Sequence, residues 1–185
     1  MIPDMAINMN VNASRWVERF LPLIVPGGRV LDLACGPGRH SLLLDRCGYR
    51  VDAVDRDADA IAGLAAAAPR IRTRVADLES GAWPYADRAF DGIVVSNYLF
   101  RPLLPLLLDA LDVNGVLIYE TFMAGNERFG KPSNPDFLLR PLELLELVQG
   151  KLSVVAFEQG EVPAPRPAMV QRICAIRGAG TLLPP

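Results

Sequence analysis

Acidic residues and glycines follow apolar runs in this chain of 185 residues, a pattern suited to holding a small charged ligand. Residues 29–40 read RVLDLACGPGRH, an apolar run that contains Asp32 and leads to Gly36 and Gly38 on either side of a proline. The run predicts a short buried strand, and the apolar spacing after it predicts a helix. Glycines in a turn at a helix N-terminus leave backbone N–H groups open to a ligand. The stretch therefore predicts a ligand site at the end of this strand.

Three other interpretations of the glycine turn compete with this one, and the sequence disfavours the first two. A dinucleotide-binding G-x-G-x-x-G turn would need a third glycine or alanine where the chain has Ser41. A phosphate-binding P-loop would need Gly-Lys followed by Ser or Thr, which the sequence lacks. The third is a tight turn that joins strand to helix and binds nothing.

A second acidic position, Asp55, ends the next predicted strand, 49–55, roughly 20 residues beyond the glycine turn. A carboxylate at this spacing can accept hydrogen bonds from both ribose hydroxyls of a nucleotide, and such charge-assisted bonds are strong. Its alternative role is to help cap the following helix, 58–68, for which Asp57 is the expected cap.

The elements that must position these residues alternate between strand and helix, which indicates a parallel sheet with right-handed crossovers. Strands are expected at 30–33, 49–55, 71–75, 90–96 and 116–121, followed by a helix at 141–149 and a hairpin of strands 152–158 and 169–177. Residues 122–136 show no periodicity, and a loop of this length usually has a function or is disordered. Because it follows the fifth strand, this loop should overhang the same sheet edge as the glycine turn.

The first helix is expected to begin at Asn12 or Ser14 and to carry Trp16 on its apolar face. Trp16 is expected to pack in the core, with a lid over a bound ligand as the alternative. Residues 1–14 are expected to be flexible.

Composition limits the classes of function. The formal net charge of −2 gives no basic field for nucleic acid, and no apolar run reaches the length of a membrane span. Cys35, Cys47 and Cys174 lack metal or redox spacing, which predicts free thiols, no metal site and a cytoplasmic protein. The length fits one domain over residues 1–185, and the start of the chain lacks a signal-peptide pattern.

Taken together, these motifs resemble those of class I S-adenosylmethionine (SAM)-dependent methyltransferases, although Ala34 stands where that family has its first glycine. The stretches YETF at 119–122, NE at 126–127 and NPDF at 134–137 are similar to small bacterial methyltransferases of the tellurite-resistance type. The resemblance implies a Rossmann-like α/β fold with helices on both faces of a seven-stranded mixed sheet. The implied strand order is 3-2-1-4-5-7-6, with the last strand antiparallel.

The same resemblance implies a SAM site. In this family an aspartate after the third strand accepts a hydrogen bond from the adenine amine and the next residue packs on the ring, which here would be Asp77 and Leu78. A polar turn is the alternative role for Asp77. The full set of cofactor contacts expected is Asp32, Ala34, Cys35, Gly36, Gly38, Asp55, Arg56, Asp77, Leu78, Ser96 and Asn97.

For catalysis, Glu120 is the expected base, because it ends a parallel strand at the ligand edge. Its alternative role is to bond backbone amides of the 122–136 loop and fix the loop over the site. Tyr98 and His40 are further candidates, and His40 has the alternative of a satisfied helix-start residue. The NPDF stretch also resembles the motif of enzymes that methylate amino groups in nucleic acid. That motif belongs after the fourth strand, so this match is rejected.

The expected function is transfer of the SAM methyl group to a small-molecule nucleophile. The alternative is a protein that binds SAM or another adenine nucleotide without catalysis and serves as a sensor or partner. An NAD-dependent oxidoreductase is disfavoured by Ser41 and by the lack of a clear acid for hydride transfer. The expected partner is a small methyl acceptor, with no nucleic acid or membrane, and the chain is expected to be a monomer or a homodimer.

Overall fold

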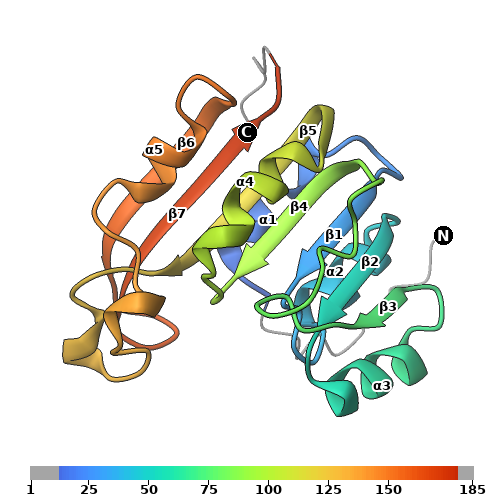
Figure 1. Ribbon diagram of the computed structural model, residues 1–185, viewed down its shortest axis with the longest axis horizontal. Coiled ribbons are helices and arrows are strands. Elements are labelled where there is room, and N and C mark those ends of the chain that lie inside the picture. Colours follow the sequence, from blue (N-terminus) through green and yellow to red (C-terminus); the bar gives the residue numbers. More distant parts are fainter. Residues whose placement is uncertain (1–12, 179–185) are drawn as a thin grey trace, which may run out of the picture.

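The computed structural model describes residues 13–178 as a mixed sheet flanked by helices (Figure 1). The strands are β1 (Arg29–Leu33), β2 (Arg50–Asp55), β3 (Arg72–Val75), β4 (Phe90–Ser96), β5 (Leu111–Phe122), β6 (Ser153–Val162) and β7 (Ala168–Ile176). The α-helices are α1 (Arg15–Phe20), α2 (Arg39–Arg46), α3 (Ala58–Ala67), α4 (Leu104–Asp109) and α5 (Glu143–Val148). Short 3-10 turns are η1 (Leu21–Leu23), η2 (Arg101–Leu103), η3 (Asn126–Phe129) and η4 (Pro135–Phe137). The expectation that residues 1–14 are flexible falls mostly outside the described residues.

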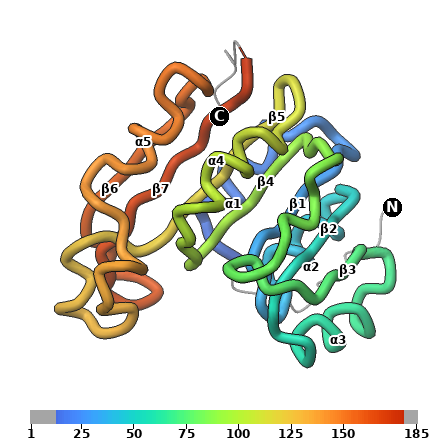
Figure 2. The backbone as a smooth tube through the Cα atoms, viewed as in Figure 1, coloured from blue at the N-terminus to red at the C-terminus, as the bar shows by residue number. Residues whose placement is uncertain are grey.

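The sheet has the order β3-β2-β1-β4-β5-β7-β6, which confirms the predicted fold class and strand order. β1 to β5 pair in parallel, whereas β7 runs antiparallel to both β5 and β6. Parallel strands joined by helices bring all their carboxyl ends to one edge, which is where open α/β sheets bind ligands. The tube in Figure 2 shows the long segment between β5 and α5 beyond that edge, next to the turn between β6 and β7.

Two hydrophobic clusters cover the two faces of the sheet. Leu31, Ile93 and Leu117 lie in register on one face and pack with side chains of α4 and α5. Their neighbours in sequence point to the opposite face, where α1, α2 and α3 pack. Trp16 belongs to this second cluster: it is buried, and its Nε1 donates to the carbonyl of Ile173. The helix that carries Trp16 is therefore part of the core, as the packing interpretation predicted.

The expected start of the fifth strand at residue 116 is wrong, because β5 begins at Leu111. The predicted turn at Asn114 and Gly115 lies inside the strand as an irregularity that shifts the register with β4. Asn114 has a φ of 63°, and a Cβ on Gly115 would lie 2.8 Å from the carbonyl oxygen of Phe90. The residues that predicted a turn therefore form a bulge within β5, and pairing with β4 resumes after the bulge. No helix in the described part of the chain is long and apolar enough to cross a membrane.

Candidate functional site

A cavity of about 340 Å³ lies at the carboxyl ends of β1 to β5, within the size range of small-ligand sites. It is lined by Ala34, Asp55, Arg56, Ala76, Asp77, Leu78, Glu79, Asn97, Tyr98, Leu99, Thr121, Phe122, Pro132 and Phe137. Residues at or just after the ends of β1, β2, β3 and β4 form a polar side, which consists of Ala34, Asp55, Arg56, Asp77, Glu79 and Asn97. The opposite, apolar wall consists of Leu99, Phe122, Pro132 and Phe137.

The glycine turn after β1 has three residues with positive φ: Ala34 at 51°, Gly36 at 55° and Gly38 at 84°. Only Gly36 has the open surroundings that the sequence suggested for both glycines, since a Cβ there would meet no atom within 4 Å. A Cβ on Gly38 would lie 2.5 Å from Leu64 Cδ1. Glycine is therefore required at position 38 for two reasons: its positive φ and the close packing of α3 on the turn. Ala34 adopts a left-handed conformation, which glycine takes up at lower cost.

The Asp55 carboxylate lies beside this turn and lines the cavity. Its Oδ2 accepts the Gly36 N–H at 2.7 Å, and its Oδ1 accepts the Asp57 N–H at 2.9 Å. Each carboxylate oxygen has a second lone pair, so Asp55 can hold the turn and accept further bonds from a ligand. The capping role belongs to Asp57, as predicted, because its Oδ1 accepts the N–H groups of Asp59 and Ala60 at 3.0 Å.

Asp77 forms the polar turn that was its alternative role, and its contact with adenine stays a prediction. Its side chain forms a polar turn, accepting the Glu79 N–H at 2.9 Å and the Ser80 Oγ–H at 2.6 Å. The hydrogen bond from the Ser80 side chain, followed by that from Glu79, lowers the pKa of the Asp77 carboxyl. Asp77 and Leu78 also line the cavity, so the turn presents a fixed, ionised carboxylate to it.

Tyr98 lines the cavity where the polar side meets the apolar wall. Its hydroxyl oxygen is buried and has no hydrogen-bond partner among the described residues. Burial raises the pKa of the Tyr98 hydroxyl well above its usual range, and the charges of Glu79 and Asp77 raise it further. The hydroxyl therefore stays protonated and can donate a hydrogen bond, but it is not suited to act as a base. An orphaned buried donor in a cavity indicates a position for a ligand acceptor.

Five residues that were expected to contact the cofactor do not line the cavity: Asp32, Cys35, Gly36, Gly38 and Ser96. Asp32 faces α2, where its Oδ2 accepts the Ser41 hydroxyl at 2.6 Å. Burial raises the pKa of the Asp32 carboxyl to about 6, against the lowering effect of that hydrogen bond. The Cys35 thiol is buried and donates to the Gly36 carbonyl at 3.5 Å. These side chains support the glycine turn from behind.

His40 is also placed behind the turn rather than in the cavity. Its Nε2 accepts the N–H of Ser14 at 3.1 Å, which joins the first turn of α2 to the start of α1. Burial, together with the positive charge of Arg39, lowers the pKa of His40 to about 4. A neutral, buried imidazole with a backbone partner fits the alternative of a satisfied helix-start residue.

Glu120 ends near the cavity but is not among its lining residues. Its Oε1 accepts the Ser96 hydroxyl at 3.4 Å, and Ser96 Oγ accepts from Arg39 Nη2 at 2.9 Å. This polar row of Arg39, Ser96 and Glu120 lies on the face of the sheet that α1 and α2 cover. A role for Glu120 as a base stays a prediction that this geometry does not support directly.

The alternative in which Glu120 anchors the long loop is wrong for the described part of the chain. The loop amides donate elsewhere: Met123 N to the Met169 carbonyl, and Gly125 N to Glu127 Oε2. The buried Asn126 is one true anchor, since its Nδ2 donates to the Pro132 carbonyl at 3.0 Å and its Oδ1 accepts the Met169 N–H at 3.1 Å. It fixes Pro132, and with it one end of the apolar wall.

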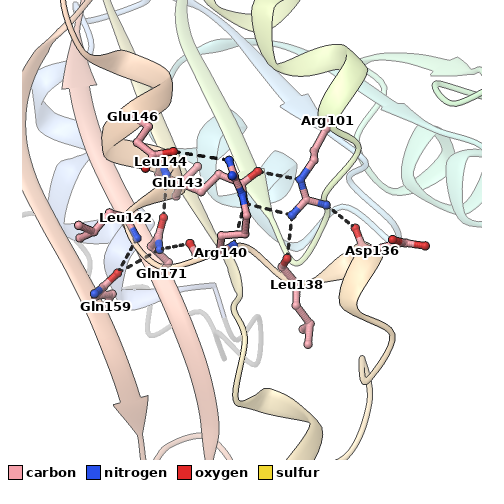
Figure 3. Close-up of polar contacts among 10 residues, drawn as sticks. All are labelled: Arg101, Asp136, Leu138, Arg140, Leu142, Glu143, Leu144, Glu146, Gln159 and Gln171. Carbon is pink, nitrogen blue, oxygen red and sulfur yellow. Dashed lines mark hydrogen bonds and ion pairs between the residues drawn. The ribbon is translucent and has the colours of Figure 1, made fainter.

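The second anchor is Arg101, shown in Figure 3. Its Nε donates to Glu143 Oε1 at 2.7 Å and its Nη2 to Glu143 Oε2 at 3.0 Å. The other side of the guanidinium donates to the backbone carbonyls of Asp136 and Leu138, each at 2.8 Å. These carbonyls flank Phe137 in sequence, so Arg101 holds the segment that carries this part of the apolar wall.

Glu143, which accepts hydrogen bonds from Arg101, is itself held in place. Glu143 is buried, and its Oε2 accepts the Arg140 N–H at 2.7 Å. Burial alone would raise the pKa of the Glu143 carboxyl, but the hydrogen bonds from Arg101 and Arg140 outweigh burial and lower it. The pair is therefore ionised and is satisfied by hydrogen bonds on both sides.

Two glutamines connect this pair to the hairpin of β6 and β7 (Figure 3). Gln171 on β7 accepts the Leu144 N–H at 2.7 Å and donates to the Arg140 carbonyl at 3.0 Å. Gln159 on β6 accepts from Gln171 Nε2 at 3.1 Å and from Leu142 N at 3.0 Å. Sequence reasoning missed this network. The length of the 122–136 loop was the only signal of it, and that signal names no residue.

Comparisons with known proteins agree with this geometry. Residues 30–111 match the model of a methyltransferase domain family. A curated relative from Chlorobaculum tepidum, a protein-L-isoaspartate O-methyltransferase, is 37% identical over 103 residues, which cover 51% of this chain and 45% of the relative. This chain therefore spans less than half the length of that relative.

Solved structures show the same fold over most of the chain. TehB from Haemophilus influenzae aligns with a TM-score of 0.72 and 22% identity, covering 94% of this chain and 63% of its own. A TehB-like SAM-dependent methyltransferase from Corynebacterium glutamicum aligns with a TM-score of 0.66 and 20% identity, covering 88% of this chain and 87% of its own. At these identities the likeness establishes the fold alone. The resemblance to class I SAM-dependent methyltransferases is confirmed for the fold and for the domain at 30–111.

Proposed function

We propose that this chain, which carries a methyltransferase domain on the class I SAM-dependent fold, moves the methyl group of SAM to a small-molecule nucleophile. The observation that carries the proposal is one cavity with two unlike halves. Asp55 and Asp77 present carboxylates on the polar side, and Phe122 and Phe137 contribute to the apolar wall opposite. A polar half can hold a nucleoside, and an apolar half leaves room for a second, smaller molecule.

The residues of the polar side fit SAM. Asp55 would accept from the ribose hydroxyls and Asp77 from the adenine amine, while Leu78 would pack on the adenine ring. Gly36 leaves the turn open to a ligand, since no atom lies where its Cβ would be. The buried Tyr98 hydroxyl supplies a donor that no described protein group uses.

SAM, when bound, supplies a methyl group on a sulfonium that becomes neutral as the methyl leaves. The protein must then mainly hold the acceptor in line with the bond that breaks, and positioning of this kind can contribute about 7–11 kcal/mol. The anchored loop serves this purpose, because Asn126 and Arg101 fix both Pro132 and the segment around Phe137. A wall held in this way also keeps water from the nucleophile.

Calorimetry with SAM and with its demethylated product tests the cofactor assignment. Both should bind, whereas NAD should not. Replacing Asp55 with Ala should reduce SAM affinity by about 1.5–3 kcal/mol, because a hydrogen bond to a charged group is lost. Asp57→Ala is the matched control: it removes a helix cap that does not line the cavity, so stability should fall by about 1 kcal/mol and SAM affinity should hold. Unchanged affinity in Asp55→Ala would reject the ribose assignment.

Turnover separates the enzyme from the alternative of a sensor. Labelled SAM is incubated with a panel of thiols, amines, phenols and oxyanions, and methylated product is followed over several equivalents of protein. Multiple turnovers support the proposal. Tight SAM binding with no product across the panel favours a non-catalytic SAM-binding protein.

A further inference from the structure

We infer that the methyl acceptor is a small molecule with an apolar or aromatic body and no negative charge, an inference that rests on the proposed function. The observation is the contrast between the apolar wall and the charges around it. An acceptor must lie where the polar side ends, against the residues contributed by the segment after β4, the end of β5 and the long loop.

The apolar wall offers nothing that would hold an anion. Leu99, Phe122, Pro132 and Phe137 have only hydrocarbon side chains, and Thr121 is the one hydroxyl beside them apart from Tyr98. An anionic group that enters such a surface loses its hydration without gaining a partner, which is strongly unfavourable. An aromatic or aliphatic body gains by the same burial, by roughly 25 cal/mol per Å² of apolar surface.

The charges that line the cavity point the same way. The polar side presents the carboxylates of Asp55, Asp77 and Glu79, and Arg56 is the one cation among the lining residues. Bound SAM, with a sulfonium and an ammonium against one carboxylate, adds a single net positive charge to that of Arg56, so an anionic acceptor would still meet more negative than positive charge here. An uncharged nucleophile or an amine meets no such barrier.

Arg101, the cation that holds the segment around Phe137, is not available to an acceptor. All three nitrogens of the Arg101 guanidinium donate to Glu143 or to the carbonyls of Asp136 and Leu138 (Figure 3). Arg101 acts as a positioning residue that brackets Phe137. Glu143 is buried, so releasing Arg101 to bind a ligand would leave that carboxylate with only the exposed Arg140 as its counter-charge, which is unfavourable.

The chemical step needs no anion. The lone pair of the acceptor's sulfur, nitrogen or oxygen forms the new bond to the methyl carbon, and the carbon–sulfur bond breaks with its electron pair moving to sulfur. The acceptor's proton then leaves to solvent. The positive charge is passed from sulfonium to acceptor and on to the proton, so every charge is accounted for.

Matched acceptors test this inference directly. Two isosteric pairs are 4-aminobenzamide with 4-aminobenzoate and 4-hydroxybenzamide with 4-hydroxybenzoate, and selenite serves as an inorganic oxyanion. Each pair has the same size and the same nucleophile and differs only in one negative charge. In each pair that reacts, kcat/KM with labelled SAM should be at least tenfold higher for the amide.

A variant and its control place the acceptor. Phe137 lines the cavity and Phe129 lies on the same loop outside it, and both are partly exposed, so either can be truncated without opening the core. Phe137→Ala should lower kcat/KM for the best amide about tenfold, with the Kd for SAM within twofold of the unmodified protein. Phe129→Ala should leave both unchanged.

The outcomes are separable from those of the proposed function. Failure to bind SAM sinks both proposals. SAM binding with a carboxylate or selenite methylated as fast as the amides, or with no pair reacting at all, overturns the acceptor inference and leaves the cofactor assignment standing. Unchanged turnover in Phe137→Ala likewise removes the apolar wall from the acceptor site.

Discussion

The polar side and the apolar wall face the same cavity but are built by different means. The polar side consists of turns that follow neighbouring strands, and it is shaped by local backbone features such as Ala34 and Asn97, with φ values of 51° and 56°. The apolar wall is held by contacts between residues far apart in sequence, of which the pair of Arg101 and Glu143 spans 42 positions. The difference teaches that the first half depends on local conformation and the second on a few long-range polar contacts.

Replacing Arg101 with Met should break the apolar wall and spare the polar side. The variant leaves the buried Glu143 with only Arg140, whose Nε lies 3.4 Å away, and it removes the donors to the carbonyls of Asp136 and Leu138. The free energy of unfolding should therefore fall by about 3 kcal/mol. The value is at the low end for a buried pair because the Arg101 side chain is 37% exposed. Urea unfolding measures the loss, and hydrogen exchange should quicken in residues 123–138.

The pair of Arg128 and Glu161 provides the control on the same loop. Its partners are 57% and 54% exposed, so Arg128→Met should cost under about 1 kcal/mol. SAM affinity should be retained in both variants. Equal losses for Arg101→Met and Arg128→Met would show that the buried pair has no special part in holding the wall.

Asp32 and His40, which support the polar side from behind, should oppose each other in their effect on pH stability. The folded pKa of Asp32 is raised to about 6 above an unfolded value near 3.9, so its contribution is present at low pH and is lost as the pH rises through 6. The folded pKa of His40 is lowered to about 4, so folding is penalised as the pH falls from about 6.5 towards 4.

Asp32→Asn removes the titration of Asp32 and leaves the effect of His40 on the pH dependence of stability. The variant keeps an acceptor for Ser41 and loses the titration, so relative to the unmodified protein it should gain on the order of 2–3 kcal/mol of stability between pH 4 and pH 7. Urea unfolding at several pH values measures this difference. Parallel pH profiles for the two proteins would contradict the raised pKa of Asp32.

Tyr98 lies where the two halves meet, and Tyr98→Phe should have effects of opposite sign. Without ligand, stability should be unchanged or slightly higher, because the lost hydroxyl is buried and has no partner among the described residues. SAM affinity should fall by about 0.5–1.5 kcal/mol if the hydroxyl bonds the ligand. Calorimetry and thermal unfolding separate these effects, and a loss of stability in the free protein would show a hidden structural partner.

Ala34→Gly should have the smallest effect, and it tests how far the polar side depends on local backbone conformation. Glycine relieves the strain of the left-handed backbone at φ 51°, but it also raises the entropy of the unfolded chain. The net result should be a gain of about 0.5 kcal/mol in the free energy of unfolding. Ala76 also lines the cavity after a strand but is not among the residues with positive φ, so Ala76→Gly should instead lose about 0.5–1 kcal/mol. Thermal unfolding that shifts the same way in both variants would contradict this.

The parts that could be predicted from the sequence are those with local causes. Apolar runs and turn residues predicted the strands and their order, and Asp57 was identified as a cap from its position before a helix. Asp32 was misjudged because a strand end does not reveal which face its side chain points to. It lies in register with Val94 and Ile118, whose side chains belong to the cluster that α2 covers.

The apolar wall escaped sequence reasoning for a different reason. Arg101 begins a short proline-containing 3-10 turn, and Glu143 resembles any acidic residue in a first helical turn. Nothing local marks them as partners. Their pairing follows only once the sheet order brings the end of β4 and the start of α5 to the same edge, which the three-dimensional structure provides.

The side chain of Asn126 has a consequence for engineering this protein. By donating to the Pro132 carbonyl it closes residues 127–131 into an exposed excursion whose two ends are already pinned. Residues inserted between the two pinned ends lengthen only the exposed part of the loop. Doubling the length of a loop costs only about 0.6 kcal/mol in closure entropy. An affinity handle or a fluorophore attachment peptide inserted after Gly130 should therefore leave the pinned ends in place, giving a reporter beside the cavity mouth that does not enter it.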